Sequence, residues 1–543
     1  MTDLRRTVSL RTAMRGIERR DWTPFIRQTD DPMEVQQALL RQMLNRHAKT
    51  AFGRKYRFTT LRTYGDFRRA LPMQSYEDLR PYIEAQDHTC NAELNAEQPR
   101  LFAQTSGTTG KPKFIPILRD TQTRIRTYQR LFAFSQYQGV SDIFEGRILV
   151  LSGQRIEGRL PTGTAYGSMS GLLYESLPLP IKEKDVLSVR VRALTDAREK
   201  YRQVAVCMLA EPALSVMAAP NPSTFLKLME LIRQHYSDLV EALSSANGRD
   251  AKGAVVVPQA SSQRLAHLRA YLGHEDQLTF ATLWPNVRAV ITWMGGNCGV
   301  LIPQLKSILS EDTALIEMGY LSSECLGSLN VDVVNNRCIP TFCDNFFEFV
   351  PLIEWDRADP RTLTLDQLEI GEKYQVLVTT PAGLYRYAMN DIVEVTGWFN
   401  RTPTIQFVQK GKGVTNITGE KLYEHHVTAA IDAVFAELRL SCEFYVMLAD
   451  VEEQQYTLYA ESGPSVLDVA YRVEERLGEL NIEFKAKRES DRLKPLVVRH
   501  LREGTADAYR EHCLRRGQRE SQFKMVRLQY SRDCLFDFSP YVR

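Results

Sequence analysis

Hydrophobic residues at helical spacing dominate the first hundred residues of the chain. Val35, Ala38, Leu39 and Met43 fall on one face of a helix, and the pattern predicts helices joined by loops. Further on, helical patterns alternate with short apolar runs that are typical of buried strands. We expect helices over 120–134, 183–200, 222–246 and 261–272, strands over 147–152 and 289–294, and a long loop over 163–180, where Gly, Ser and Pro are frequent.

A change of pattern near residue 410 indicates a domain boundary. The apolar run 404–408 predicts a strand, and Gln409-Lys-Gly-Lys-Gly413 after it has the composition of a hinge. We expect helices over 422–438, 466–480 and 506–516 and strands over 443–449, 456–460 and 496–500, with the helices on one face of the sheet. The predicted fold is α/β, with a large domain of mixed sheets and helices at 1–410 and a small, mobile α+β domain at 411–543.

Composition narrows the class of protein. The chain is 43% hydrophobic and 25% charged, as in ordinary globular domains, and its formal net charge of +3 comes without the basic stripe of a nucleic-acid-binding protein. The nine cysteines are scattered without a Cys-x-x-Cys pair, which favours reduced thiols in a cytoplasmic protein and argues against structural zinc. No secretory signal and no membrane-spanning apolar run is apparent. We expect small-molecule partners and a monomer or weak homo-oligomer.

The strongest candidate for chemistry is the segment Thr105-Ser-Gly-Thr-Thr-Gly-Lys-Pro-Lys113. Its hydroxyls, its glycines and its two lysines suit a polyanion, because none of these groups must change protonation state to complement negative charge. The spacing differs from that of a Walker A loop, since only two residues separate Gly107 from Gly110 and proline follows Lys111. The pattern therefore indicates a phosphate-binding loop of another kind, with a surface turn as the alternative.

Two later segments carry further candidate ligands of a nucleotide. In Met318-Gly-Tyr-Leu-Ser-Ser-Glu-Cys-Leu-Gly327, the ring of Tyr320 suits packing on a planar base, and Glu324 suits Mg²⁺, which prefers few carboxylates together with phosphate oxygens. Asp391 precedes the apolar residues Ile392 and Val393, so we expect it at the start of a strand, where its carboxylate can accept hydrogen bonds from two ribose hydroxyls. Each residue taken alone is more often structural.

Together the three segments resemble known enzymes. Ser106–Lys113 resembles the phosphate loop of acyl-adenylate-forming enzymes. Tyr385-Arg-Tyr-Ala-Met-Asn-Asp391, with Val395–Pro403 after it, resembles the Gretchen Hagen 3 auxin-responsive family of acyl acid amido synthetases, as do 347–349 and 416–421. The resemblance covers most of the chain. It implies that ATP and a carboxylic acid give acyl-AMP and pyrophosphate, and that an amine, usually of an amino acid, then displaces AMP.

The same resemblance implies roles for individual residues. The residues expected to bind phosphate are Thr105, Ser106, Gly107, Thr108 and Thr109. Tyr320 is expected to bind adenine, and Ser323 belongs to the same nucleotide site. Glu324 is expected to bind Mg²⁺, and Asp391 is expected to bind ribose. Lys421 and Lys524 are candidate catalytic residues that contact phosphate from the C-terminal domain. Trp293 and Met294, which depart from the family pattern, are candidates for lining the acyl pocket. Tyr128 and Arg130 are candidates for binding the substrate carboxylate, and the alternative for this pair is a solvated helix face.

Two other functions remain open at this point. An enzyme of the same type can transfer its acyl group to a thiol of coenzyme A or of a carrier protein, and a protein that kept only the fold can bind a nucleotide without catalysis. The adjacent His425 and His426 project about 100° apart on a helix, so we interpret them as structural and not as a metal-binding pair. The sequence does not identify the acid or the amine.

Overall fold

The computed structural model describes residues 2–105, 112–245, 258–355, 357, 359–411, 413–440, 442–462, 469–515 and 526–543. These residues form two compact units. The first, unit 1, contains the described residues up to 105, 113–296 and 304–409; the second, unit 2, contains 112, 297–303 and the described residues from 410 to 543. The mixture of helices and sheets in both confirms the predicted α/β class. That the units are domains that move against each other stays a prediction.

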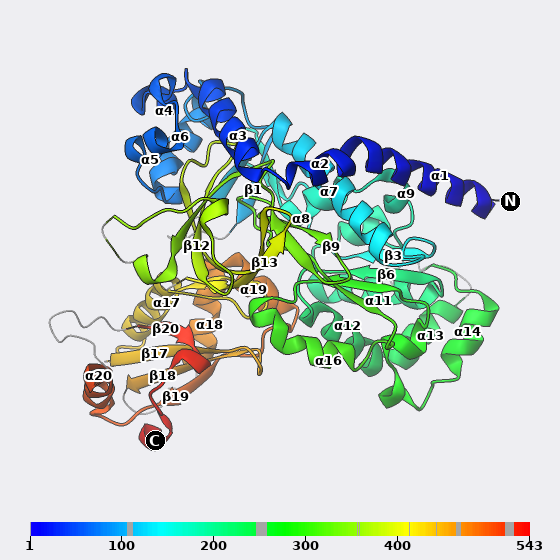
Figure 1. Cartoon of the computed structure of the whole chain (residues 1–543). Helices are drawn as coiled ribbons and strands as arrows, with labels where there is room; N and C mark the ends of the chain where they lie inside the picture. The colour runs from blue at the N-terminus through cyan, green and yellow to red at the C-terminus, as the bar shows by residue number, and fades with distance from the viewer. Residues whose placement is uncertain are drawn as a thin grey trace. The chain divides into compact units, whose positions relative to one another are not determined.

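Unit 1 begins with helices, as the apolar spacing predicts (Figure 1). Their starts carry polar caps: the Asp31 side chain accepts a hydrogen bond from the Glu34 amide, and Ser75 and Asp78 form a capping box. The helices are α1 (Thr2–Ile17), α2 (Thr23–Gln28), α3 (Pro32–His47), α4 (Ala51–Lys55), α5 (Tyr64–Ala70) and α6 (Tyr76–Thr89).

A parallel sheet in the order β3-β6-β7-β8 lies at the centre of one half of unit 1. Its strands are β3 (Arg147–Val150), β6 (Leu214–Ala218), β7 (Ala289–Thr292) and β8 (Ala314–Glu317). Leu149, Met217 and Val290 pack with helix residues in one apolar core, because a parallel sheet is covered on its faces. Figure 1 shows the covering helices α11 (Ala197–Ala210), α12 (Ser223–Gln234), α13 (Tyr236–Ser244) and α14 (Ser262–Arg269) beside this sheet. The strands predicted near 147 and 289 are thus confirmed.

Two further sheets complete unit 1. One has the order β2-β1-β5-β4, from strands β1 (Leu101–Thr105), β2 (Lys113–Ile117), β4 (Gly158–Arg159) and β5 (Ala165–Gly167). The other is antiparallel, from β11 (Phe346–Pro351), β12 (Lys373–Thr379), β13 (Tyr387–Phe399) and β14 (Thr402–Lys410). The hairpin of β9 (Ser328–Asp332) and β10 (Arg337–Pro340) follows β8, and α7 (Arg119–Gly139), predicted over 120–134, follows β2.

Two local predictions for unit 1 are wrong. The stretch 163–180 is not a long loop, because it contains β5 and α8 (Met169–Glu175), whose Met169 and Leu172 are buried in the core. No single helix runs over 183–200: α10 (Val189–Arg192) ends early, and α11 starts after Asp196, which caps it. The helical segment predicted over 222–246 is confirmed in its described residues, where it forms two consecutive helices, α12 and α13, that meet at His235. The first stretch is helical where its residues are buried in the core, and the second is interrupted where Asp196 caps the start of α11.

Unit 2 contains a sheet in the order β19-β18-β17-β20. Its strands are β17 (Cys442–Asp450), β18 (Gln455–Ser462), β19 (Val497–His500) and β20 (Leu528–Tyr530), and its helices are α17 (Glu424–Glu437), α18 (Val469–Leu480), α19 (Ile482–Glu489) and α20 (Thr505–Arg515). Alternate residues of β17 enter two different cores: Tyr445 and Met447 pack with α17 and α18, whereas Phe444 packs with Tyr509 of α20. The prediction of helices on one face only is therefore wrong, because both faces of the sheet are apolar.

Within the part of the chain that the structure describes, no helix combines the length and the apolar character needed to cross a membrane.

His47, at the end of α3, predicts a pH dependence of stability. Its Nε2 lies 3.2 Å from the Pro381 carbonyl, and its Nδ1 accepts from the Ala96 amide at 3.1 Å, an arrangement that requires a neutral ring. Burial, aided by the charge of Arg46, lowers the pKa of His47 from 6.5 to about 4. Because the folded pKa lies below the unfolded one, this contribution is complete above pH 6.5 and is lost as the pH falls toward 4.

We expect the free energy of unfolding to fall by about 3 kcal/mol over that pH window through His47 alone. Denaturant unfolding at pH 7 and pH 4.5 measures this effect, and His47→Gln should flatten the difference because glutamine does not titrate. His88→Gln, at an exposed histidine, is the matched control. An unchanged pH dependence in His47→Gln would show that another group causes the loss.

Candidate active site

The predicted phosphate loop lies mostly outside the described residues. Thr105 ends β1 and is partly buried. Ser106, Gly107, Thr108 and Thr109 lie outside the described residues, and so does Lys524 of the C-terminal region. Their predicted contacts with phosphate stay predictions.

Tyr320 and Asp391, predicted to bind adenine and ribose, are in direct contact. The Tyr320 hydroxyl donates to Oδ2 of Asp391 at 2.7 Å, and both residues are buried, with 6% and 1% of their surfaces exposed. The ring of Tyr320 also stacks on Phe407 of β14, with centroids 5.9 Å apart. Burial and the charge of Asp391 raise the pKa of Tyr320 well above its usual value, so the hydroxyl remains a donor. Two motifs that lie 71 residues apart in sequence thus meet in unit 1.

Asp391 lies inside β13, so the prediction that it starts a strand is wrong. The register shifts there: Gln375 pairs with Ile392, but Leu377 pairs with Ala388, which leaves three residues of β13 opposite one residue of β12. Asn390 within this bulge has a φ of 52°. A bulge re-aims the side chains of its strand, which is how a residue inside a sheet comes to face Tyr320.

A buried ion pair anchors the start of β13. Arg386 pairs with Glu348 of β11 at 3.0 Å, and the two side chains are 5% and 1% exposed. Arg386 also donates to the carbonyl of Leu71 at 2.6 Å. Removing one partner of such a pair leaves an uncompensated buried charge, so the pair resists displacement of the segment that leads to Asp391.

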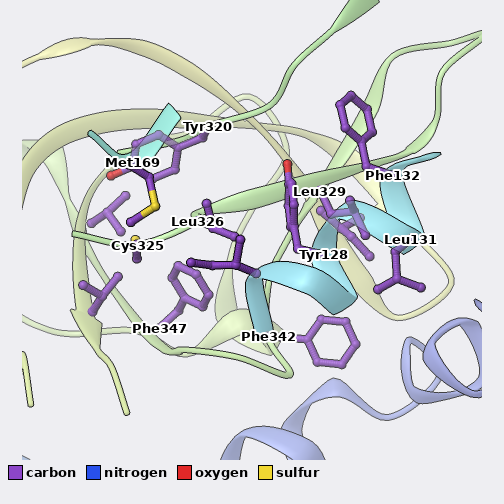
Figure 2. Packing of buried hydrophobic residues seen from close by; sticks show 14 of the residues in the cluster. Tyr128, Leu131, Phe132, Met169, Tyr320, Cys325, Leu326, Leu329, Phe342 and Phe347 are labelled. Carbon is purple, nitrogen blue, oxygen red and sulfur yellow. The ribbon is translucent and has the colours of Figure 1, made fainter. Parts of the chain in front are cut away.

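Ser323 and Glu324 occupy the tip of a tight hairpin loop. Leu321 and Leu326 form an antiparallel bridge, and the amide of Gly327 donates to the Tyr320 carbonyl at 2.8 Å. The sides of the loop are anchored because Cys325 and Leu326 enter the core, where Figure 2 shows them near Tyr320, Met169 and Phe347. Ser323 and Glu324 themselves are only partly buried. The backbone on both sides of Glu324 is therefore anchored, and its predicted binding of Mg²⁺ stays a prediction.

Trp293 and Met294 directly follow β7. The indole Nε1 of Trp293 donates to the Gly319 carbonyl at 3.0 Å, and both side chains are partly buried. The next residues, Gly295 and Gly296, approach β14 closely: a Cβ at Gly296 would lie 2.6 Å from the Val408 carbonyl oxygen, and its φ is 57°. The glycine cluster is thus required for contact with another strand, and the predicted acyl-pocket role of Trp293 and Met294 stays a prediction.

Tyr128 and Arg130, both on α7, have protein partners. The hydroxyl of Tyr128 donates to the Ser328 carbonyl at 3.1 Å, and Figure 2 shows its ring among buried apolar residues. Arg130 forms an ion pair with Asp21 at 2.8 Å. Both side chains thus have partners within the protein, and the predicted contact with a substrate carboxylate stays a prediction.

Sequence reasoning missed Glu317, the last residue of β8. Its Oε2 accepts from the amides of Met294 at 2.7 Å and Gly295 at 3.1 Å, and its Oε1 accepts from the amide of Gly319 at 2.9 Å. Burial raises the pKa of Glu317, while these hydrogen bonds lower it. The available signal was an acidic residue at the end of an apolar run, which is common on exposed strand ends.

In unit 2, Lys421 ends a turn that is held by buried hydrogen bonds. Lys421 has a φ of 46°, and its neighbour Glu420, with none of its surface exposed, accepts from the Ile417 amide at 2.6 Å and the Tyr456 hydroxyl at 2.6 Å. Asn481 donates to the Glu420 carbonyl at 2.9 Å. The backbone that carries Lys421 is therefore fixed, and the predicted contact of its side chain with a phosphate stays a prediction.

Comparisons with known proteins cover nearly the whole chain. Models of the GH3 family match three consecutive regions: its N-terminal domain matches 23–314, its central domain 338–410 and its C-terminal domain 425–533. Similar curated proteins include the indole-3-acetic acid-amido synthetases GH3.15 of Arabidopsis thaliana and GH3.8 of Oryza sativa subsp. indica. The first is 25% identical over 93% of this chain and 92% of its own length, the second 24% over 97% and 94%.

Solved structures agree on the fold. The GH3.15 acyl acid amido synthetase superposes with a TM-score of 0.63 at 22% identity and covers 96% of both chains. A 2-hydroxyisobutyryl-CoA ligase in complex with 2-HIB-AMP and CoA superposes with a TM-score of 0.56 at 12% identity, covering 93% of this chain and 91% of its own. The fold is therefore that of adenylate-forming enzymes.

Proposed function

The chain belongs to the GH3 family, and on that premise we propose that it is an ATP-dependent acyl acid amido synthetase, a ligase that joins a carboxylic acid to an amine. The single observation that supports this best within the structure is the 2.7 Å hydrogen bond between Tyr320 and Asp391, because it unites two predicted nucleotide residues in one place. The names of similar proteins, acid-amido synthetases, point to an amide product, and the family resemblance of the motifs makes an amino acid the amine that we propose.

The reaction we propose has two steps. A carboxylate oxygen of the acid attacks the α-phosphorus of ATP, the bond to the bridging oxygen breaks, and pyrophosphate leaves. The amine nitrogen then attacks the acyl carbon, loses a proton, and displaces AMP as the bond between carbon and the phosphate oxygen breaks. Each step moves negative charge onto phosphate oxygens, so fixed donors and cations accelerate both.

Side chains of the described residues fit this chemistry. Asp391 would accept hydrogen bonds from ribose hydroxyls, oriented by the Tyr320 hydroxyl, while the ring of Tyr320 borders the base. Trp293 and Met294, at the carboxyl end of β7, would contact the acid, since ligands of parallel sheets bind beyond the carboxyl ends of the strands. Lys421 would neutralise phosphate charge from its fixed turn in unit 2.

Glu324 would hold Mg²⁺. A single carboxylate at a rigid hairpin tip fits this ion, which is usually bound through one or two carboxylates and completed by phosphate oxygens and water. Among the described residues no cluster of three His, Cys, Asp or Glu side chains forms a protein cage for a metal. When bound, Mg²⁺ would offset the charge of the phosphates.

The test is release of pyrophosphate from ATP and Mg²⁺ across a panel of aromatic and aliphatic carboxylic acids, with and without a mixture of amino acids. We expect acid-dependent release that amino acids accelerate and an amide product detected by mass spectrometry. Release that responds only to coenzyme A would assign the chain to thioester formation instead. A chain that binds ATP but never releases pyrophosphate would be a nucleotide-binding protein.

A further inference from the structure

Glu317 links two loops that the proposed function assigns to different substrates. Thr292 and Glu317 are the last paired residues of the neighbouring parallel strands β7 and β8. Beyond them the chain continues into Trp293 and Met294 on one side and into Gly319 and Tyr320 on the other. The Glu317 carboxylate accepts hydrogen bonds from two backbone amides of the first loop and from one of the second, at 2.7–3.1 Å. The carboxylate thus fastens both loops at once.

The rest of Glu317 is also fixed. Its amide donates to Oδ1 of Asn336 at 2.7 Å, and its carbonyl accepts from Nδ2 of Asn330 at 2.9 Å. Among the described residues, no Lys, Arg or His lies within ion-pair distance of its carboxylate. Burial, with a smaller contribution from the negative charge of Glu317, raises the pKa of the nearby Tyr128 and Cys338. Three backbone amides therefore stabilise the charge of this carboxylate, as a cation usually does where a carboxylate has little access to water.

Other contacts join the same two loops. The indole of Trp293 donates to the Gly319 carbonyl at 3.0 Å, and the Met318 amide donates to the Thr292 carbonyl at 3.0 Å. Beyond Gly319, Tyr320 hydrogen-bonds to Asp391. A continuous set of short contacts thus runs from Met294 through Glu317 and Gly319 to Tyr320 and Asp391. These contacts tie the two loops to each other.

We propose that Glu317 is a positioning residue that couples the loop of Trp293 and Met294 to the loop of Gly319 and Tyr320, so that the acid side and the nucleotide side of the site are organised as one. The inference rests on the proposed function for the identity of the two sides. Glu317 itself contacts no substrate in this account, because both of its carboxylate oxygens are engaged by backbone amides. Its effect on binding is transmitted through Gly319 and Tyr320.

Glu317→Gln tests the coupling with little change of shape. The amide group retains one acceptor, so its NH₂ must face either the Gly319 amide or the amides of Met294 and Gly295, and one loop is released. We expect the Kd of α,β-methylene-ATP with Mg²⁺, measured by calorimetry, to rise about tenfold. Glu311→Gln, the same change at an exposed residue before β8, should leave that Kd unchanged.

A double-mutant cycle separates coupling between the two loops from a nonspecific loss of nucleotide binding. Trp293→Phe removes the indole donor on the acid side, and it too should weaken binding of the nucleotide analogue. The two changes should be non-additive, because both release the same Gly319 segment. Equal Kd values for Glu317→Gln and Glu311→Gln, or additive effects in the cycle, would overturn the proposal. If the unmodified protein failed to bind the analogue, the proposed function itself would be wrong.

Discussion

Replacing Glu324 by alanine is expected to slow acid-dependent pyrophosphate release about a thousandfold while the protein remains folded. The carboxylate lies at the tip of the hairpin loop that Leu321 and Leu326 close, and its truncation removes the charge proposed to hold Mg²⁺ against the phosphates. Initial rates at saturating ATP, acid and Mg²⁺ measure the loss. The loop itself should persist, since Cys325 and Leu326 anchor it in the core.

Two further variants make that result specific. Glu324→Gln keeps the shape of the side chain and loses its charge, so it should be almost as slow, and its requirement for Mg²⁺ should rise. Glu372→Ala, at an exposed glutamate of unit 1, is the matched control and should retain full rate. Normal turnover in Glu324→Ala with an unchanged Mg²⁺ requirement would remove Glu324 from the site.

Asp391→Asn is expected to raise the KM for ATP by about tenfold to a hundredfold, with a smaller effect on kcat. A hydrogen bond to a charged group contributes about 1.5–3 kcal/mol, and the substitution replaces one carboxylate oxygen by a donor. The Tyr320 hydroxyl donates to Oδ2 of Asp391 at 2.7 Å, so the substitution also disturbs the contact that orients this side chain. Steady-state kinetics with ATP as the varied substrate measures the change.

Tyr320→Phe shows how much of the change in KM comes from the orientation of Asp391 and how much from its direct contact with ribose. The variant keeps the ring that stacks on Phe407 and loses only the hydroxyl that orients Asp391. A KM for ATP raised by less than that of Asp391→Asn is the expected result. Asp312→Asn, an exposed aspartate in the turn before β8, serves as control. A KM for ATP unchanged in Asp391→Asn would refute a role of this carboxylate in ribose binding.

Sequence patterns predicted the larger elements because these depend on local periodicity. The apolar spacing of α3 and the buried runs of β3 and β7 are properties of a few consecutive residues. By contrast, the Gly and Ser content of the stretch that forms α8 predicts a loop. In the structure Ser168 caps this helix, and Met169 and Leu172 are buried against distant residues. The second apolar face of β17 is also covered by a distant element, because α20 packs on it.

The candidate site shows the same limit at the level of single residues. The family motifs marked Tyr320 and Asp391 as nucleotide residues, but their mutual hydrogen bond depends on a register shift between β12 and β13 that no pattern within β13 reveals. Glu317 was missed because its partners are backbone amides, which every residue type except proline carries. A motif therefore identifies side chains that meet a ligand more readily than those that hold the backbone around it.

Transfer of oxygen from the acid to AMP tests the central claim most directly. The carboxylic acid that supports turnover is labelled with ¹⁸O in its carboxyl group, the reaction is run to completion with ATP and the amine, and the products are analysed by mass spectrometry. An acyl-adenylate requires that one ¹⁸O atom appears in AMP and none in pyrophosphate. Amide formed with unlabelled AMP, or with the label in any other phosphate, would contradict the mechanism proposed for this protein.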